Sequence, residues 1–318
     1  MMKNKDLYAV AVRRPNGEIA VQTKEYAGIL HDHLVTKIPF VRGIFNFIDS
    51  LALGVQALNK SAEYFEEEED QTKDENKKPG QEKKKKTLDK ISSILTIIIA
   101  IALCVGLFIF LPFYLSGLLS GVIRNESVVN VLEGVIRIVI FLIYVLLISL
   151  MKDIRRTYMY HGAEHKCINC LERGRALTVS NVRRSSRLHK RCGTSFLLFV
   201  MLVSVVLFFF IRIDNQVYKL LLRVALIPVV AGISYELIRL AGKTDNIFTK
   251  ILSAPGFLLQ KITTKEPDED MIEVAIASVE AVFDWKRFLK TEFEVDPDVS
   301  DDPNLSYTTQ WDPKDLNL

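Results

Sequence analysis

The sequence predicts an α-helical integral membrane protein with four transmembrane helices, a small N-terminal β-hairpin and cytoplasmic amphipathic helices. Two observations carry this prediction. Hydrophobic residues make up 49% of the 318 residues, and many of them gather in four long segments. Lysine and arginine are concentrated before the first segment and between the second and third, and such basic stretches usually lie on the cytoplasmic side of membrane proteins.

The four apolar segments are each near the roughly 20 residues that cross a bilayer. They cover 91–120, 131–151, 195–211 and 220–240, and the third is short but unbroken. In the second, Glu133 and Arg137 lie one helical turn apart, so their side chains can pair. Few other polar residues interrupt the segments and no inverted repeat is visible, which argues against a transporter.

Charge sets the orientation. The stretch 152–194 carries eleven Lys or Arg against three Asp or Glu, and 83–86 is a run of four lysines. The loops 124–130 and 212–219 carry few basic residues. The positive-inside rule therefore places both termini and the loop 152–194 in the cytoplasm, which is a reducing compartment. The N-terminus has no apolar core typical of a signal peptide.

The N-terminal part begins with a predicted hairpin over 7–25, because Asn16-Gly17 is a strong turn signal between two alternating runs. An amphipathic helix is expected over 38–58, lying on the cytoplasmic leaflet or under the helix bundle. The run from Glu66 to Lys86 is low in complexity and highly charged, which predicts a disordered linker whose lysines meet anionic lipid.

After the fourth span, 251–259 is apolar but broken by Ala254-Pro255-Gly256, which favours a short interfacial segment. Helical spacing returns over 271–283. The stretch 265–318 carries fifteen Asp or Glu against five Lys or Arg. Its negative charge would allow it to dock on the basic loop of the same molecule. The sequence thus predicts five parts. They are the hairpin and amphipathic helix (1–65), the charged linker (66–90), the membrane domain with its loop 152–194 (91–243), a cytoplasmic helical segment (244–295) and an acidic tail (296–318).

The run Y-H-G-A-E-H-K-C-I-N-C, residues 160–170, carries the most specific chemistry. His161 and His165 are four residues apart and share one face of a helix, and Glu164 joins them. Two imidazoles so placed can bind a divalent metal, with a carboxylate beside its bound water. The alternative to a metal site is a structural role. In that case the histidines form hydrogen bonds to headgroups or helix ends, and Glu164 pairs with Arg155 or Arg187.

A second cluster, His189 and Cys192, immediately precedes the third span. Adjacent antiparallel spans bring both clusters to a similar depth, so His161, His165, His189 and Cys192 form a reasonable tetrahedral set for zinc. Four ligands would make a closed structural site, whereas three would leave a position for water, with Glu164 as a base. Cys167 and Cys170 are expected to pack locally or to be spare ligands.

Several blocks of the chain resemble the YqhQ-like family of bacterial inner-membrane proteins, a family of unknown function. The blocks are 9–19, 160–166, 177–196, 228–243 and 263–276. The resemblance implies a bacterial cell-membrane location. It favours His161, Glu164, His165, His189 and Cys192 as the site, and members are often labelled predicted metal-dependent enzymes. Two departures stand out. The family usually opens with a glycine-rich stretch, whereas this sequence begins at Met1-Met2, either because the start was assigned too late or because the segment is absent; and Lys190 replaces a common proline.

The order H-x-x-E-H is also similar to that of the inverzincin proteases, in which a distal glutamate completes the zinc site. Glu236 is the candidate for that position, although an ion pair with Arg239 is an equal alternative. One functional hypothesis is a metal-dependent hydrolase or transferase acting at the cytoplasmic leaflet on a lipid, lipid-linked or peptide substrate. The other is a non-catalytic scaffold or accessory factor in membrane-protein insertion or complex assembly, whose basic loop meets anionic lipid, ribosomal RNA or translocation machinery.

Overall fold

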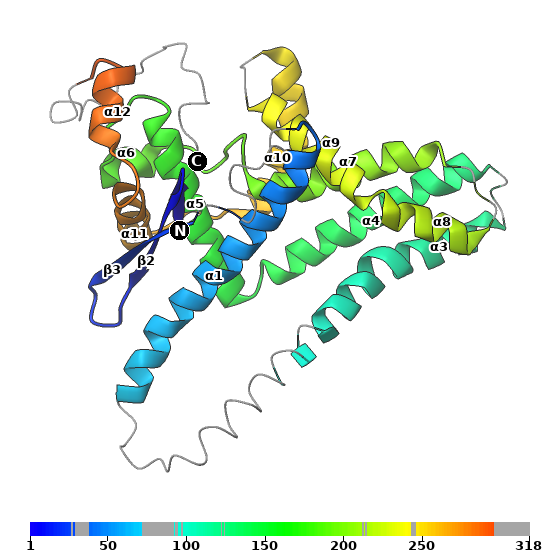
Figure 1. Cartoon of the computed structure of the whole chain (residues 1–318), viewed down its shortest axis with the longest axis horizontal. Helices are drawn as coiled ribbons and strands as arrows, with labels where there is room; N and C mark the ends of the chain where they lie inside the picture. Colours follow the sequence, from blue (N-terminus) through cyan, green and yellow to red (C-terminus); the bar gives the residue numbers. More distant parts are fainter. Residues whose placement is uncertain are drawn as a thin grey trace. The chain divides into compact units, whose positions relative to one another are not determined.

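The computed structural model describes residues 1–26, 28, 38–71, 92, 95–96, 98–121, 123, 125–211, 213, 215–242 and 246–295 (Figure 1). The chain divides into two compact units, which are described separately. Unit 1 contains Met1–Ala62, Val145–Val200 and Leu226–Leu318, and unit 2 contains Glu63–Tyr144 and Met201–Ala225. The expected tail, 296–318, and the part of the expected linker over 72–90 lie outside the described residues.

Unit 1 begins with a small antiparallel sheet. Strands β2 (Leu7–Arg13) and β3 (Ile19–Glu25) form the predicted hairpin, with Leu7 opposite Glu25 and Arg13 opposite Ile19. Gly17 has φ of +89°, a conformation that glycine adopts without steric cost, which explains the turn signal. A third strand, β1 (Met2–Asn4), pairs with β2 and was not predicted.

Helix α1 (Val41–Gln71) is longer than the sequence indicated. It continues beyond residue 58, where we expected the amphipathic helix to end, and past Glu66, where we expected the disordered linker to begin. Glutamate is a good helix former, so an acidic run can prolong a helix that has already been nucleated. Within unit 1, the start of α1 packs closely on α9 (Ile227–Ala241), since a Cβ added at Gly43 would come 2.5 Å from Tyr235 Cβ.

Four helices and the sheet enclose the hydrophobic core of unit 1. They are α5 (Lys152–Leu171), α6 (Val179–Arg184), α11 (Glu269–Glu280) and α12 (Trp285–Glu292). Leu171, Val182, Ile272 and Leu289 are almost fully buried in this core. The helix expected over 271–283 is confirmed by α11, whereas α12 lies in the helical segment expected over 244–295 but was not predicted as a separate helix. In Figure 1, α11 and α6 lie beside α5.

Helix α10 (Ile247–Thr263) corrects the expectation of a break near Pro255. The helix runs through this proline without interruption. Proline removes one backbone donor and disfavours a helix interior, but packing of both flanking turns can outweigh this cost. Asn246 caps the helix, since its side chain accepts a hydrogen bond from the Thr249 backbone at 2.8 Å. Helix α10 packs on α9.

Two helices of the described chain, Ile98–Leu119 and Ser127–Ile148, are long and apolar enough to cross a membrane. The pair α8 (Gln216–Ala225) and α9 adds a third candidate if it forms one span, and α7 (Gly193–Phe209) is apolar but shorter. The first candidate includes a π-helical turn, Gly106–Phe110, followed by α3 (Leu111–Ser120), and the second lies within α4 (Glu126–Ile148). The fold is thus mostly helical, with two or three candidate spans.

A polar network holds the apolar helices of unit 2 together. The predicted pair of Glu133 and Arg137 is present, with nitrogen and oxygen 2.8 Å apart. Arg223 of α8 also binds Glu133, at 2.5 and 2.6 Å, and donates to Asn130 Oδ1 at 3.1 Å. Glu133 and Arg223 are both buried, so Arg223 is an essential partner that sequence spacing alone did not reveal.

Candidate metal centre

Helix α5 presents His161 and His165 on one face, as their spacing predicted. Their rings lie edge to face with centroids 4.3 Å apart. Gly162, between them, lets the chain after α10 approach closely, because a Cβ there would come 2.1 Å from the Lys265 carbonyl oxygen. The backbone N–H of Lys265 donates to the Tyr158 carbonyl at 2.9 Å, which fixes this contact.

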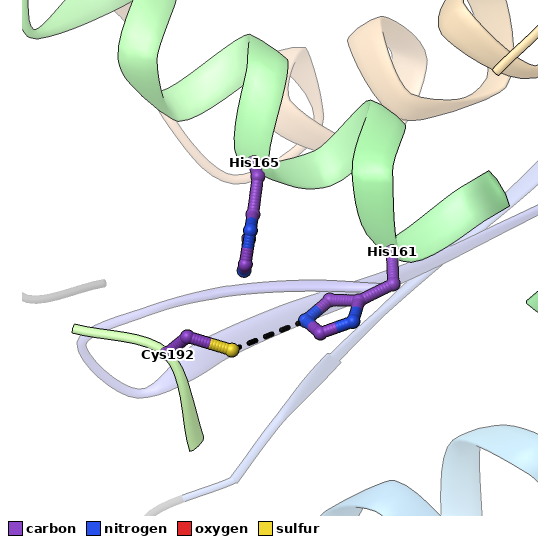
Figure 2. A group of neighbouring side chains, drawn as sticks. All are labelled: His161, His165 and Cys192. Carbon is purple, nitrogen blue, oxygen red and sulfur yellow. Dashed lines mark hydrogen bonds between the residues drawn. The ribbon is translucent and has the colours of Figure 1, made fainter. Parts of the chain in front are cut away.

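Cys192 lies at the corner that leads into α7 and faces the two histidines (Figure 2). Its Sγ is 3.3 Å from His161 Nε2. Gln260 of α10 braces the corner: it accepts from the His189 backbone N–H at 2.8 Å and donates to the His189 carbonyl at 2.8 Å and to Ser195 Oγ at 2.9 Å. The corner is thereby tied to α10 by both donors and the oxygen of one buried amide.

His161, His165 and Cys192 are the described residues that form a group able to hold a metal ion. Their ligand atoms all lie within 4.8 Å of one another. Zinc bonds of about 2.0–2.3 Å in tetrahedral geometry would separate ligand atoms by about 3.3–3.6 Å, so only a small inward adjustment is needed. His165 and Cys192 are buried and His161 is half-buried.

Both histidines are oriented by backbone carbonyls. His161 Nδ1 lies 3.0 Å from the Thr263 carbonyl oxygen, and His165 Nδ1 lies 2.7 Å from the Arg187 carbonyl oxygen. Because a carbonyl only accepts, each Nδ1 must carry the proton, which leaves Nε2 as the nitrogen able to coordinate a metal. Metal-binding histidines commonly have this outer hydrogen bond, which fixes the tautomer and the ring orientation.

The site also favours a charged pair in the metal-free protein. Burial works to lower the pKa of His161, but its hydrogen bond to Cys192 and the nearby charges of Cys192 and Glu164 raise it to about 9. Burial works to raise the pKa of Cys192, but hydrogen bonds from His161 and His165 lower it well below its usual value. A thiolate is the form of cysteine that binds metal, so the histidines prepare it for binding.

A family model described as "Protein of unknown function (DUF1385)" matches residues 38–285. The chain belongs to this DUF1385 family. It is also similar to "Uncharacterized protein YqhQ" of Bacillus subtilis (strain 168), with 36% identity over 287 residues, which cover 87% of each chain. No solved structure matches the chain.

In this DUF1385 chain, His189 lies near the three-residue group but outside it. Its ring centroid is 5.7 Å from that of His165, and its Nε2 is 3.1 Å from Glu172 Oε1. Arg191 binds the same carboxylate oxygen at 2.5 Å. Burial works to raise the pKa of Glu172, but His189 and Arg191 lower it, so the carboxylate is ionised. The role of His189 as a fourth ligand stays a prediction, and in this structure its Nε2 is bound to Glu172.

The two candidate glutamates differ in their surroundings. Glu164 accepts a hydrogen bond from the Met1 amino group at 2.5 Å, and its side chain is 28% exposed. Among the described residues, this contact takes the place of the expected pairing with Arg155 or Arg187. Glu236 instead pairs with Arg42 of α1, with distances of 2.7 and 2.6 Å from its two oxygens. The pairing of Glu236 with Arg42, in place of Arg239, gives it a structural role in holding α1 against α9.

Lys166 and Asn169 position the loop beyond α5 and were missed in the sequence. Lys166 Nζ donates to the carbonyls of Arg183 and Ser185, each at 2.9 Å, and Asn169 Nδ2 donates to Ser186 at 2.7 Å. Lys166 is buried although it is charged, and it also pairs with Glu266 at 2.9 Å. A lysine on the inward face of a helix was the available signal, because burial of such a group requires partners.

Cys167 and Cys170 lie in the hydrophobic core of unit 1. Burial is the main cause that raises the pKa of both thiols, to about 12 for Cys170, so they are protonated and unreactive. This supports local packing as their role.

The acidic segment after α10 contacts the basic loop, since Arg183 binds Glu269 at 2.5 Å and Arg187 lies 3.5 Å from Glu266.

Proposed function

We propose that this chain is a multi-pass membrane protein that binds a divalent, zinc-type metal through His161, His165 and Cys192. The observation that carries the proposal is the orientation of the three donors. Each histidine donates its Nδ1–H to a backbone carbonyl, which leaves Nε2 to coordinate a metal, and His161 Nε2 lies 3.3 Å from the Cys192 sulfur. Two imidazoles and a thiolate form a donor set that zinc prefers.

The membrane part of the proposal rests on the two long apolar helices, the third candidate pair and the apolar α7. The four spans expected from the sequence, a bacterial cell-membrane location and cytoplasmic termini complete this proposal. In that orientation α5 and Cys192 lie at the cytoplasmic face. Helix α1 supports a membrane surface location, because Ile48, Leu51, Val55 and Leu58 form an exposed apolar stripe along it.

For activity, the proposal is metal-dependent hydrolysis. Three protein ligands leave a coordination position for a substrate or water, as in catalytic zinc sites, and the bound ion supplies a Lewis acid. His161, His165 and Cys192 would hold that ion, and their outer partners Thr263 and Arg187 would keep the imidazoles in place. Glu164, next to His165 and partly exposed, is the carboxylate proposed to accept a proton from the attacking water.

The alternative is a scaffold in which the metal only fastens the loop 185–195 to α5. The burial of His165 and Cys192 favours this alternative, because a closed site excludes substrate. The dense ties of the loop to α5 and α10, through Lys166, Asn169 and Gln260, favour it as well. A membrane-protein complex at the cytoplasmic leaflet would then be the partner, and exposed arginines such as Arg184 would contact anionic lipid or RNA.

The Glu164→Gln and His161→Ala variants separate the two functions. If Glu164 is the base, Glu164→Gln should abolish complementation of a deletion strain while metal content and protein level stay near those of the wild type, because an amide cannot take up the proton. If the metal is structural, His161→Ala should lower metal content and protein level together, and Glu164→Gln should be mild. Lack of metal in the wild-type protein purified without chelator and supplied with zinc would refute the metal site itself.

A further inference from the structure

Helix α10 has its polar side toward the protein and its apolar side outward. Its buried inward stripe follows a spacing of four and three residues and consists of Thr249, Ser253, Gly256, Gln260 and Thr263. These five residues are small or polar, and Leu259 beside Gln260 is the one large apolar side chain among the buried residues of α10. In a water-soluble protein, a surface helix turns its apolar stripe toward the core, so α10 has the reverse arrangement.

The outward stripe is correspondingly apolar. Ile247, Ile251 and Leu258 are 78%, 68% and 63% exposed, and Phe248 beside them is 61% exposed. At 100° per residue, Ile247, Ile251 and Leu258 lie within about 40° of one another on the side of α10 opposite to Gly256. Contact of this stripe with water would be unfavourable from Ile247 to Leu258. Lipid or another protein surface is therefore expected to cover it.

We propose that the outer face of α10 is embedded among the lipid acyl chains at the edge of the bilayer. This inference rests on the membrane location in the proposed function, but not on the metal. Helices in lipid pack through small residues and turn large apolar residues outward, and α10 does both: a Cβ added at Gly256 would come 2.6 Å from Ser195 Oγ at the start of the apolar α7.

The charged residues of α10 fit the same placement. Lys250 and Lys261 are exposed, and at 100° per residue they lie only about 20° apart around the helix, to one side of the apolar stripe. A helix lying in the membrane surface would direct this edge toward the phosphate groups, since lysine extends its ammonium to the polar region while its stem stays in lipid. The acyl chains would then cover Ile251 and Leu258.

This placement brings the candidate metal centre to the membrane surface. The inward face of the same helix supplies Gln260, which braces the His189–Cys192 corner, and Thr263, whose carbonyl orients His161. The cluster therefore lies behind α10, at about one helix diameter, or 10 Å, from the lipid that covers the outer face. A substrate or partner of the site would meet it at the bilayer, not in the bulk cytoplasm.

Quenching of tryptophan fluorescence by lipids with brominated acyl chains tests the placement. The full chain in proteoliposomes would carry Phe248→Trp or Leu258→Trp, with Ile101→Trp in the first candidate span as the lipid-exposed control and Lys290→Trp on α12 as the water-exposed control. The signal of the unsubstituted protein is subtracted, because it contains two tryptophans of its own. We expect the tryptophans at 248 and 258 to lose at least half as large a fraction of their emission as that at 101.

The outcomes separate this inference from the proposed function. If the tryptophans at 248 and 258 are quenched no more than that at 290 while that at 101 is quenched, α10 is covered by protein, such as a second copy or another segment, and the inference is wrong. If the tryptophan at 101 is not quenched either, membrane integration fails and the inference fails with it. Zinc content, measured on the same samples, reports the metal site independently of both results.

Discussion

Gly162→Ala tests whether the chain after α10 holds the candidate metal centre in shape. The new Cβ would come 2.1 Å from the Lys265 carbonyl oxygen, a distance that real Cβ atoms essentially never show, so the segment must move by about 1 Å. Alanine improves helix propensity by about 1 kcal/mol, whereas overpacking costs about 1–3 kcal/mol. The obstructing atom belongs to the backbone, and Lys265 is itself hydrogen-bonded to Tyr158, so we expect a net loss of about 1–2 kcal/mol.

The same movement should weaken metal binding. Thr263, two residues before Lys265, orients His161 through a 3.0 Å hydrogen bond, and loss of such an outer partner typically lowers metal affinity about 10–100-fold. Thermal unfolding and zinc retention against a competing chelator, both on detergent-purified protein, measure the two effects.

Gly54→Ala on α1 is the matched control, because a Cβ there meets nothing within 4 Å. It should bind zinc like the wild type and unfold at an equal or slightly higher temperature. The reasoning would be refuted if Gly162→Ala retained zinc and unfolded together with Gly54→Ala.

Three other predictions concern charge. The raised pKa of His161 stabilises the folded protein, and this contribution is full below about pH 6.5 and is lost as pH rises through about 9. The lowered pKa of Cys192 also stabilises the folded protein, and this contribution is full above about pH 8.5 and is lost as pH falls toward the pKa of the thiol in the folded protein. Between about pH 6.5 and 8.5 the fall of the His161 contribution offsets the rise of the Cys192 contribution. The difference in melting temperature between the metal-free wild type and the His161→Gln, Cys192→Ser double variant should therefore be constant in this range and smaller on either side. A steady rise of this difference with pH would contradict the ion pair. Glu133→Gln should cost about 3–5 kcal/mol, because it leaves the guanidinium groups of Arg137 and Arg223 beside a neutral amide, and thermal stability and membrane yield measure this loss; wild-type values for both would show that the network adds no stability. Reporter fusions at Asn125 and Asn215 should behave as external and one at Ser180 as cytoplasmic, and an external signal at Ser180 would overturn the proposed topology.

Features encoded by neighbouring residues were predictable from the sequence. Asn16-Gly17 specified the hairpin because turn conformation depends on the turn residues themselves. The spacing of His161 and His165 specified a shared helix face, and the position of Cys192 just before the apolar segment 195–211 indicated that it would lie near them. The pairing of Glu133 with Arg137 followed from helical spacing in the same way.

Features that depend on distant partners were not predictable. Nothing near His189 in the sequence indicated that Glu172 would bind its ring, and nothing near Glu236 indicated Arg42. Pro255 suggested a break because the packing that sustains α10 on both sides of it is tertiary. Strand β1 is only three residues long, so its pairing with β2 leaves little pattern in the sequence.

In the proposed membrane topology, the π-helical turn of unit 2 bears on how the chain is assembled. The Phe108 carbonyl, within the turn Gly106–Phe110, accepts a hydrogen bond from Arg137 Nε at 3.0 Å, so α4 contributes to fixing the rotation of the first candidate span. Glu133 and Arg137 are synthesised together and form a neutral pair, which lowers the cost of inserting α4. Arg223 follows 90 residues after Glu133 and joins a carboxylate that is already in place. In that topology, the order of the residues along the chain is compatible with insertion of a neutral helical hairpin first, with Arg223 joining Glu133 last.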